Sequence, residues 1–207
     1  MLLSIPKIKL AAALLLACAL PVAAQSQELG DGTPIRMDDV ARLAQFDAAA
    51  GSALLDMMAF ASEADRNAVA AALLGQPMPS EDALQELPGT WSCQMMKLGG
   101  NLGAVVYQPF KCSAGSDGSF EKLTGSQRTK GAVHRDGDQL VYLGTGFIYD
   151  DPQPPAYADL PDPVDPQSLP QRVPEVGILQ VINTNRARIL FPYPVLESKF
   201  NILLLTR

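Results

Sequence analysis

Near the N-terminus the apolar positions follow the period of an α-helix. Apolar side chains recur at steps of three and four between residues 38 and 74, which places them on one helix face. These side chains are Leu43, Phe46, Ala50, Leu54, Met57, Met58 and Ala61. Ser62 then begins a capping-box-like stretch with an acid, Asp65, three positions later, and Gly75 with Pro77 ends the second helix. The pattern predicts an Ala-rich helical hairpin.

From Gly89 onward the pattern changes to the period of a β-strand. Short runs rich in β-branched and aromatic residues alternate with turns of Gly, Asp and Asn. The predicted strands are 89–98, 104–112, 120–124, 129–135, 139–147, 177–183, 186–191 and 199–206. Most of their connections are short enough for hairpins, so the strands are antiparallel neighbours in sequence order. Closing such a sheet removes its exposed edges. The predicted fold class is α+β, with a helical hairpin followed by an eight-stranded β-barrel or curled meander.

One connection breaks the pattern of hairpins. Residues 150–176, the Pro/Asp-rich segment, contain eight prolines and five aspartates with few apolar side chains. Such a long stretch without helix or strand is typical of a lid, a binding arm or a disordered loop. Asp159, Asp162 and Asp165 allow a calcium interpretation, but the prolines between them restrict the backbone and no Gly-containing ligand loop surrounds them. A solvated loop is therefore the favoured interpretation, with a partner-binding arm as an alternative.

The first residues have the composition of a secretory signal peptide. Lys7 and Lys9 precede an apolar run at 10–20, and small residues around Ala24 provide a cleavage site. We therefore predict a periplasmic or secreted protein cleaved near Ala24. Lipidation at Cys18 is the less favoured alternative, because few apolar residues separate Lys9 from this cysteine. The domain prediction follows: signal peptide 1–24, helical region 25–80 packed on the barrel, and barrel domain 81–207.

Charge and cysteine content narrow the classes of partner. The 207 residues carry a formal net charge of −6, which disfavours nucleic acid and anionic lipid as partners. No later apolar run is long enough for a transmembrane anchor. In an oxidising compartment Cys93 and Cys112 predict one disulfide, and two free buried thiols are the alternative. The oligomeric state is left open.

Residues suited to catalysis or metal binding are scattered. The chain has one histidine, His134, beside Arg135 and Asp136, and a single histidine does not form a two-histidine metal site. A nucleophile elbow is absent, because the stretch around Ser126 lacks the second glycine. The interpretation of His134 as a surface or turn residue is favoured over that of a catalytic base. We expect no cofactor, no metal and no enzymatic activity.

The densest polar stretch runs from Lys122 to Gly131 and places three cations in an acidic protein. Side chains at alternating positions of a barrel strand point inward and can line a polar pocket. The candidate ligand-binding residues are Lys122, Ser126, Gln127 and Arg128, with Tyr142 and Glu197 as supports. The alternative interpretation is a solvated hairpin of mixed charge.

Several motifs together resemble an uncharacterised family of exported bacterial proteins known only as a domain of unknown function. They are Gly89-Thr90-Trp91-Ser92-Cys93, Val106-Tyr107 before Cys112, the stretch 122–128, Leu140-Val141-Tyr142-Leu143-Gly144 and the closing 196–200. This resemblance covers most of the predicted mature chain and implies no activity. More weakly, the Gly-x-Trp at residues 89–91 resembles lipocalin and calycin barrels. That resemblance implies a lipocalin-like barrel in which Trp91 packs across the closed end as a core plug.

Three classes of function are consistent with these features. A non-enzymatic binding protein would use the barrel pocket or rim for a small or lipid-like ligand, and this is the favoured class. A protein–protein interaction or inhibitor module would use loops and the Pro/Asp-rich segment, ordered only on binding. A hydrolytic enzyme ranks third, because it needs a cleft where titratable residues converge. The expected partner is an unknown small molecule or an exported protein.

Overall fold

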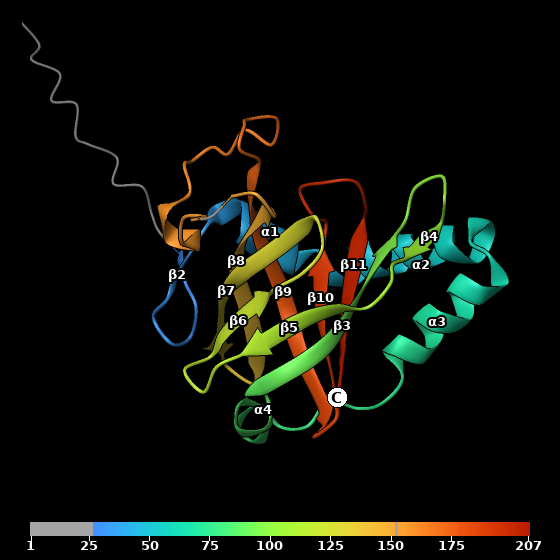
Figure 1. Cartoon of the computed structure of the whole chain (residues 1–207), viewed down its shortest axis with the longest axis horizontal. Coiled ribbons are helices and arrows are strands. Elements are labelled where there is room, and N and C mark those ends of the chain that lie inside the picture. The colour runs from blue at the N-terminus through green and yellow to red at the C-terminus, as the bar shows by residue number, and fades with distance from the viewer. Residues whose placement is uncertain (1–26, 152) are drawn as a thin grey trace, which may run out of the picture.

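The β-strands occupy eight antiparallel positions and form a closed barrel (Figure 1). The computed structural model describes residues 27–151 and 153–207. The barrel strands are β3 Gly89–Leu98, β4 Ala104–Val106, β5 Phe110–Ala114, β6 Ser119–Lys122, β7 Gln127–Asp136, β8 Gln139–Ile148, β9 Arg172–Asn183, β10 Arg186–Pro192 and β11 Phe200–Thr206. Strand β11 pairs with both β10 and β3, which closes the ring. The predicted α+β class is confirmed, and the sheet is a closed barrel rather than an open meander.

The predicted second strand is divided in two. Strands β4 and β5 pair with successive parts of β3 and together fill one position of the barrel. The break lies around Pro109, which has no backbone N–H to donate to a neighbouring strand. The other predicted strands are present with bounds shifted by a few residues, except β9, which starts at Arg172 instead of Gly177.

One end of the barrel is filled by an apolar core. Trp91, Phe120 and Tyr142 are each at most 1% exposed and pack there with inward side chains of β9, β10 and β11. Helix α4 Ser80–Glu86 lies across this end (Figure 1). The Trp91 indole Nε1 donates a hydrogen bond to the Leu87 carbonyl at 2.8 Å. This end of the barrel is therefore closed by side chains and covered by a helix.

The disulfide lies inside the barrel. Cys93 and Cys112 are joined, both are fully buried, and both belong to the same core cluster as Trp91. The predicted disulfide is confirmed. It links β3 to β5 next to the pairing of Trp91 with Cys112.

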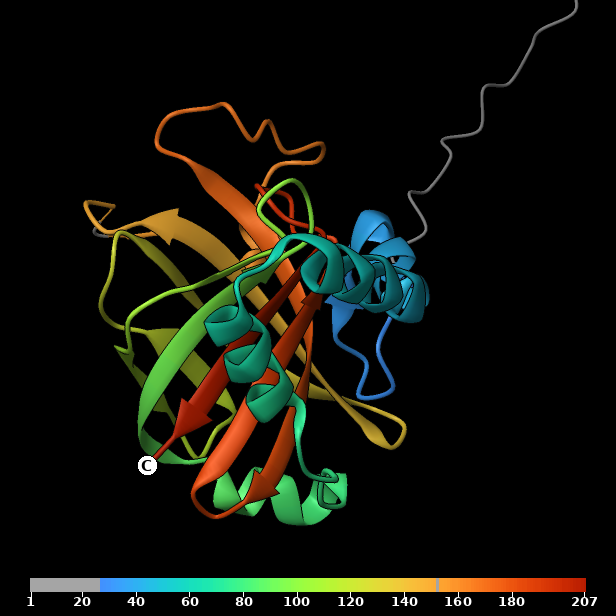
Figure 2. The same ribbon diagram turned by 90° about the vertical axis from the view of Figure 1, so that its right-hand side faces the viewer.

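The remaining helices cover one side of the barrel from the outside (Figure 2). They are α1 Met37–Ala44, α2 Phe46–Phe60 and α3 Glu63–Leu73, preceded by the short pair β1 Gln27–Glu28 and β2 Pro34–Ile35. Helices α2 and α3 pack on outward side chains of β3, β10 and β11, whereas α1 packs on β9. Alternation along each strand thus gives the sheet an apolar outer face beneath the helices and a separate inner face.

The predicted helical hairpin needs two corrections. The first predicted helix ends at Ala44 and a second begins at Phe46, because Gln45 departs from helical geometry. The buried line of α2 consists of Ala49, Ala53 and Met57, whereas Met58 is 63% exposed. The small alanine side chains allow the α2 backbone to approach the sheet closely, so the packed face lies beside the predicted one. The predicted cap of α3 is present, since the Ser62 side chain accepts a hydrogen bond from the Asp65 N–H.

The Pro/Asp-rich segment is not a solvated loop throughout, and this part of the prediction is wrong. A 3₁₀ turn at Tyr157–Asp159 places Tyr157 and Leu160 at 8% and 5% exposure. Tyr157 packs with Ile35 and Val176 in a small apolar cluster. Tyr157 thus attaches this part of the segment to β2 through Ile35. Residues 161–171 are mostly exposed, with Leu169 at 92%.

The predicted signal peptide, its cleavage site and Cys18 lie outside the described residues. Within residues 27–151 and 153–207, no helix has the length and apolar character needed to cross a bilayer.

Candidate ligand site at the open end of the barrel

The end of the barrel opposite α4 contains a cavity of about 90 Å³. Its position follows from the strands, because the last inward positions of several strands at this end are polar rather than apolar. The polar side chains that line it on these strands are Lys97 of β3, Lys122 of β6, Gln127 and Thr129 of β7, Glu175 of β9 and Asn201 of β11. Apolar walls come from Met95, Phe110, Val173 and Phe191 among others. The interior therefore changes along the barrel axis from a packed apolar core to a cavity lined by both polar and apolar side chains.

Lys122 is the most buried cation of the cavity. The residue is 4% exposed, and its ammonium lies 3.9 Å from the centre of the Phe110 ring and donates a hydrogen bond to the Gln127 carbonyl. Burial lowers the pKa of Lys122 from 10.5 to about 8, because removal from water disfavours the charged form. The Glu175 carboxylate acts in the opposite direction, while Arg128 and Lys97 lower the pKa further.

Glu175 brings a carboxylate into the same cavity. Gly146 of β8 faces it, and a Cβ at this glycine would lie 3.0 Å from the Glu175 Oε1 atom. The Oε2 atom is buried and has no hydrogen-bond partner among the described residues. Burial raises the pKa of Glu175, against the lowering effects of a hydrogen bond from Thr129 and of the nearby cations Arg42, Lys122 and Lys97. A buried carboxylate oxygen without a donor is costly unless another molecule supplies one.

Other charges around the cavity already have partners. The Lys97 ammonium forms an ion pair with Glu197 and donates to the Gln127 Oε1 atom at 2.8 Å. Burial of Lys97 is partial, since its side chain is 11% exposed. Hydrogen bonds from Lys97 and Gln127 lower the pKa of Glu197, so this rim carboxylate is charged at neutral pH.

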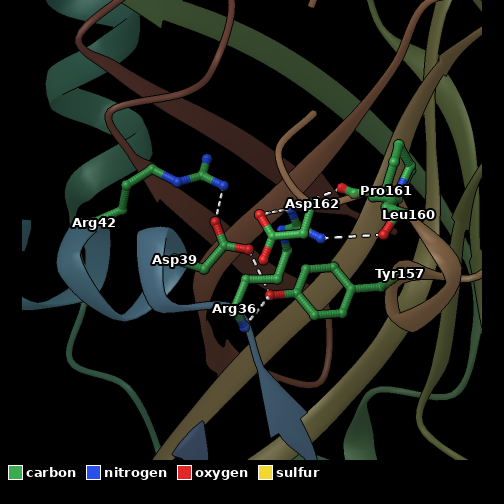
Figure 3. A network of polar contacts seen from close by, with 7 residues as sticks. All are labelled: Arg36, Asp39, Arg42, Tyr157, Leu160, Pro161 and Asp162. Carbon is green, nitrogen blue, oxygen red and sulfur yellow. Dashed lines mark hydrogen bonds and ion pairs between the residues drawn. The ribbon is translucent and has the colours of Figure 1, made fainter. Parts of the chain in front are cut away.

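Arg42 connects the cavity wall to helix α1 and the Pro/Asp-rich segment (Figure 3). It pairs with the fully buried Asp39 and donates to the Pro174 carbonyl beside Glu175 at 3.1 Å. The Tyr157 hydroxyl donates a hydrogen bond to Asp39, and burial together with this carboxylate raises the pKa of Tyr157 well above its ordinary value. Arg36 holds the next turn through the Leu160 and Pro161 carbonyls and Asp162. The network fixes the start of β9 and hence the position of Glu175.

Comparison with protein families identifies the chain. A family model described as Domain of unknown function (DUF4893) matches residues 33–205. The chain belongs to this family. Neither the comparison with curated proteins nor the comparison with solved structures found a match. Of the two resemblances seen in the sequence, the one to a domain of unknown function is thereby shown, whereas the lipocalin-like one is supported only by the eight-stranded barrel.

In this DUF4893 domain five of the six predicted site residues lie at the open end of the barrel, and Tyr142 lies in the core beneath it. Lys122, Ser126, Gln127 and Arg128 all border the cavity. Arg128 alternates with Gln127 and Thr129 along β7, so its side chain belongs to the other face of the strand, and its Nε donates to the Gly125 carbonyl at 3.2 Å. The role of these four predicted residues in ligand binding stays a prediction.

The two predicted supporting residues, Tyr142 and Glu197, lie in different parts of the site. Tyr142 lies beneath the cavity in the apolar core, and its hydroxyl is 2.6 Å from the Thr129 hydroxyl oxygen. Burial raises the pKa of Tyr142 well above its ordinary value, so the hydroxyl stays protonated. Glu197 stands at the rim with Lys97. Tyr142 therefore forms part of the floor, and Glu197 part of the edge.

Sequence reasoning missed Glu175, Lys97 and Arg42. Glu175 lies in the Pro/Asp-rich segment, where the surrounding prolines gave no sign of a strand. Lys97 has a readable signal, because it alternates with Trp91, Cys93 and Met95 along β3 and so shares their inward face. Arg42 has no such signal, since its approach to β9 depends on the packing of α1.

Residues considered for other chemistry lie elsewhere. His134 does not line the cavity, and its Nδ1 is 3.0 Å from the Thr33 hydroxyl and 3.3 Å from Asp31. Asp162 pairs with Arg36, and the Asp165 side chain accepts a hydrogen bond from the Gln167 N–H. Among the described residues, no group of three or more His, Cys, Asp or Glu side chains is arranged to hold a metal ion.

Proposed function

We propose that this protein binds a small polar molecule in the open end of its barrel. The observation that supports the proposal is a pair of ionisable side chains, the buried Lys122 and the half-buried Glu175 with its buried Oε2 atom, beside an open cavity above a packed core. Burying charge costs free energy, and the barrel would be more stable with apolar side chains at both positions. Recognition of a ligand explains why the chain carries this cost at the site.

The size of the cavity favours a small ligand over a lipid-like one. Its volume of about 90 Å³ is small for a ligand pocket. Pockets for drug-sized molecules measure roughly 300–1,000 Å³. We therefore assign the cavity to a molecule of a few non-hydrogen atoms, or to the polar end of a longer one.

We further propose binding without chemistry, in a compartment outside the cytoplasm. His134, the one histidine, is held by Thr33 and Asp31 away from the cavity. The Cys93–Cys112 disulfide supports an oxidising compartment, as does the predicted signal peptide. The alternative of an interaction module is less favoured, because the part of the Pro/Asp-rich segment around Tyr157 is already packed.

The proposal is tested by titrating isotope-labelled protein with small molecules and recording backbone amide shifts by NMR. The probes are acetate, glycolate, inorganic phosphate, glycerol and methylammonium, which differ in charge and in hydrogen-bonding groups. We expect at least one probe to shift amides around the cavity. Val173→Phe, which adds a ring to the cavity wall, should abolish these shifts, whereas Val164→Phe in the mostly exposed stretch 161–171, outside the cavity lining, should preserve them. Absence of cavity shifts with every probe would refute the proposed function.

A further inference from the structure

Only some of the charged side chains that line the cavity are free to bind a ligand. Lys97 is paired with Glu197, and Arg42 is paired with Asp39. Among the described residues, Lys122 has no ion-pair partner within 4.0 Å. Its charge nevertheless lowers the pKa of Glu175. Its ammonium has three donor hydrogens, and one of them is used by the Gln127 carbonyl. Arg128 also borders the cavity without an ion pair in the described part of the chain, but it alternates along β7 with the inward Gln127 and Thr129. Lys122 is therefore the cation with spare donors among the inward-facing side chains.

The second free group is the Glu175 carboxylate. Its Oε2 atom is buried, without a hydrogen-bond partner among the described residues, although the side chain borders the cavity. Lys122 is on β6 and Glu175 is on β9, and β7 and β8 separate these strands around the barrel. The two groups thus approach the cavity from different walls. A ligand between them meets a donor cation on one wall and an acceptor oxygen on the other.

These two groups define complementary chemistry. The ammonium selects an anionic group, and a carboxylate is the smallest organic anion that offers several acceptor sites. The Glu175 oxygen selects a donor, which is a hydroxyl or an ammonium group. A single free cation matches a single negative charge better than the double charge of a phosphate ester. The volume of about 90 Å³ requires the anion and the donor to be separated by only a few bonds.

We infer that the ligand of this cavity is a small monocarboxylate that carries a hydroxyl or ammonium group, with its carboxylate on Lys122 and its donor on Glu175. This inference rests on the proposed binding function and specifies its ligand class. It also assigns specificity: Lys122 provides affinity for the anion, and Glu175 discriminates between carboxylates with and without a donor.

The test compares glycolate with acetate, which lacks the hydroxyl group, in the same NMR titration. A hydrogen bond to a charged group predicts that glycolate binds about tenfold or more tightly than acetate. Glu175→Gln should bring the two affinities to within about threefold, because a neutral amide oxygen replaces the carboxylate acceptor. Glu121→Gln on β6, outside the cavity, is the matched control and should retain the preference.

A second pair of variants tests the cation. Lys122→Met should abolish saturable binding of both carboxylates, whereas the exposed Lys111→Met on the neighbouring β5 should bind both like the wild type. Equal binding of glycolate and acetate by the wild type would overturn the inference, as would a glycolate preference that survives Glu175→Gln. Cavity shifts with glycerol, methylammonium or phosphate alone would overturn the ligand class while supporting the proposed function. Absence of cavity shifts with all five probes would refute both the ligand class and the proposed function.

Discussion

The buried Lys122 makes the stability of this protein depend on pH in a direction that can be calculated. Its pKa of about 8 in the folded state lies below the ordinary value of 10.5. Between these values the unfolded chain binds a proton that the folded chain has released, so the free energy of unfolding rises with pH. From about pH 7 to about pH 9.5 the rise amounts to about 2 kcal/mol, of a total near 3 kcal/mol for the whole shift.

Lys122→Met keeps most of the aliphatic volume and removes this titration. Urea unfolding at a series of pH values, followed by the fluorescence of Trp91, the one tryptophan, measures both proteins. We expect the difference in free energy of unfolding, variant minus wild type, to fall by about 2 kcal/mol between about pH 7 and about pH 9.5. Lys111→Met, which changes an exposed lysine on the adjacent strand, should leave the wild-type rise intact.

The coupling of Lys122 to Glu175 requires one further comparison. Removing the lysine takes away one of the three nearby cations that lower the pKa of Glu175, so this pKa rises further and adds its own pH dependence. Repeating the measurement in the Glu175→Gln background isolates the lysine. Parallel curves for the proteins with and without Lys122, in both backgrounds, would refute the reasoning, because they would mean that the ammonium titrates as if it were in water.

Three other predictions concern stability alone. Cys93→Ala/Cys112→Ala, which opens a loop with a sequence separation of 19, should lower the free energy of unfolding by about 3 kcal/mol in urea; a loss below about 1 kcal/mol would contradict the expected constraint on the unfolded chain. Asp39→Asn leaves Arg42 without its buried partner and should cost about 3 kcal/mol in the same assay, whereas a cost near that of an exposed pair, under about 1 kcal/mol, would show that the network contributes little. Gly131→Ala would place a Cβ 2.1 Å from the Leu143 carbonyl oxygen and should cost about 3 kcal/mol. Gly51→Ala, where nothing lies within 4 Å of the added Cβ, should instead stabilise helix α2 by about 0.5–1 kcal/mol. Thermal unfolding followed by circular dichroism distinguishes the two glycine variants, and equal shifts would contradict the difference in packing.

Local patterns in the sequence were sufficient to predict most elements of the fold. Alternation of apolar side chains located eight strand positions, because each barrel strand has one face inside and one face outside. The turn residues between them predicted antiparallel neighbours, since short hairpins allow no other pairing. The disulfide followed from two cysteines and the expected compartment. Part of the candidate site, Lys122 to Arg128, was visible as a polar interruption at the end of a strand.

The tertiary structure decided what no local pattern contains. Closure of β11 on β3 is a long-range pairing, and the same strands read singly are equally consistent with an open meander. Glu175 sits among prolines that favour an extended loop, and only the register of β9 against β8 places it inside the barrel. The same holds for Arg42, which reaches the cavity because Asp39 and Tyr157 hold α1 against the start of β9. The sequence thus determined which face of each strand is inward, a property of neighbouring residues. Which inward charges meet depends on contacts between residues more than a hundred positions apart.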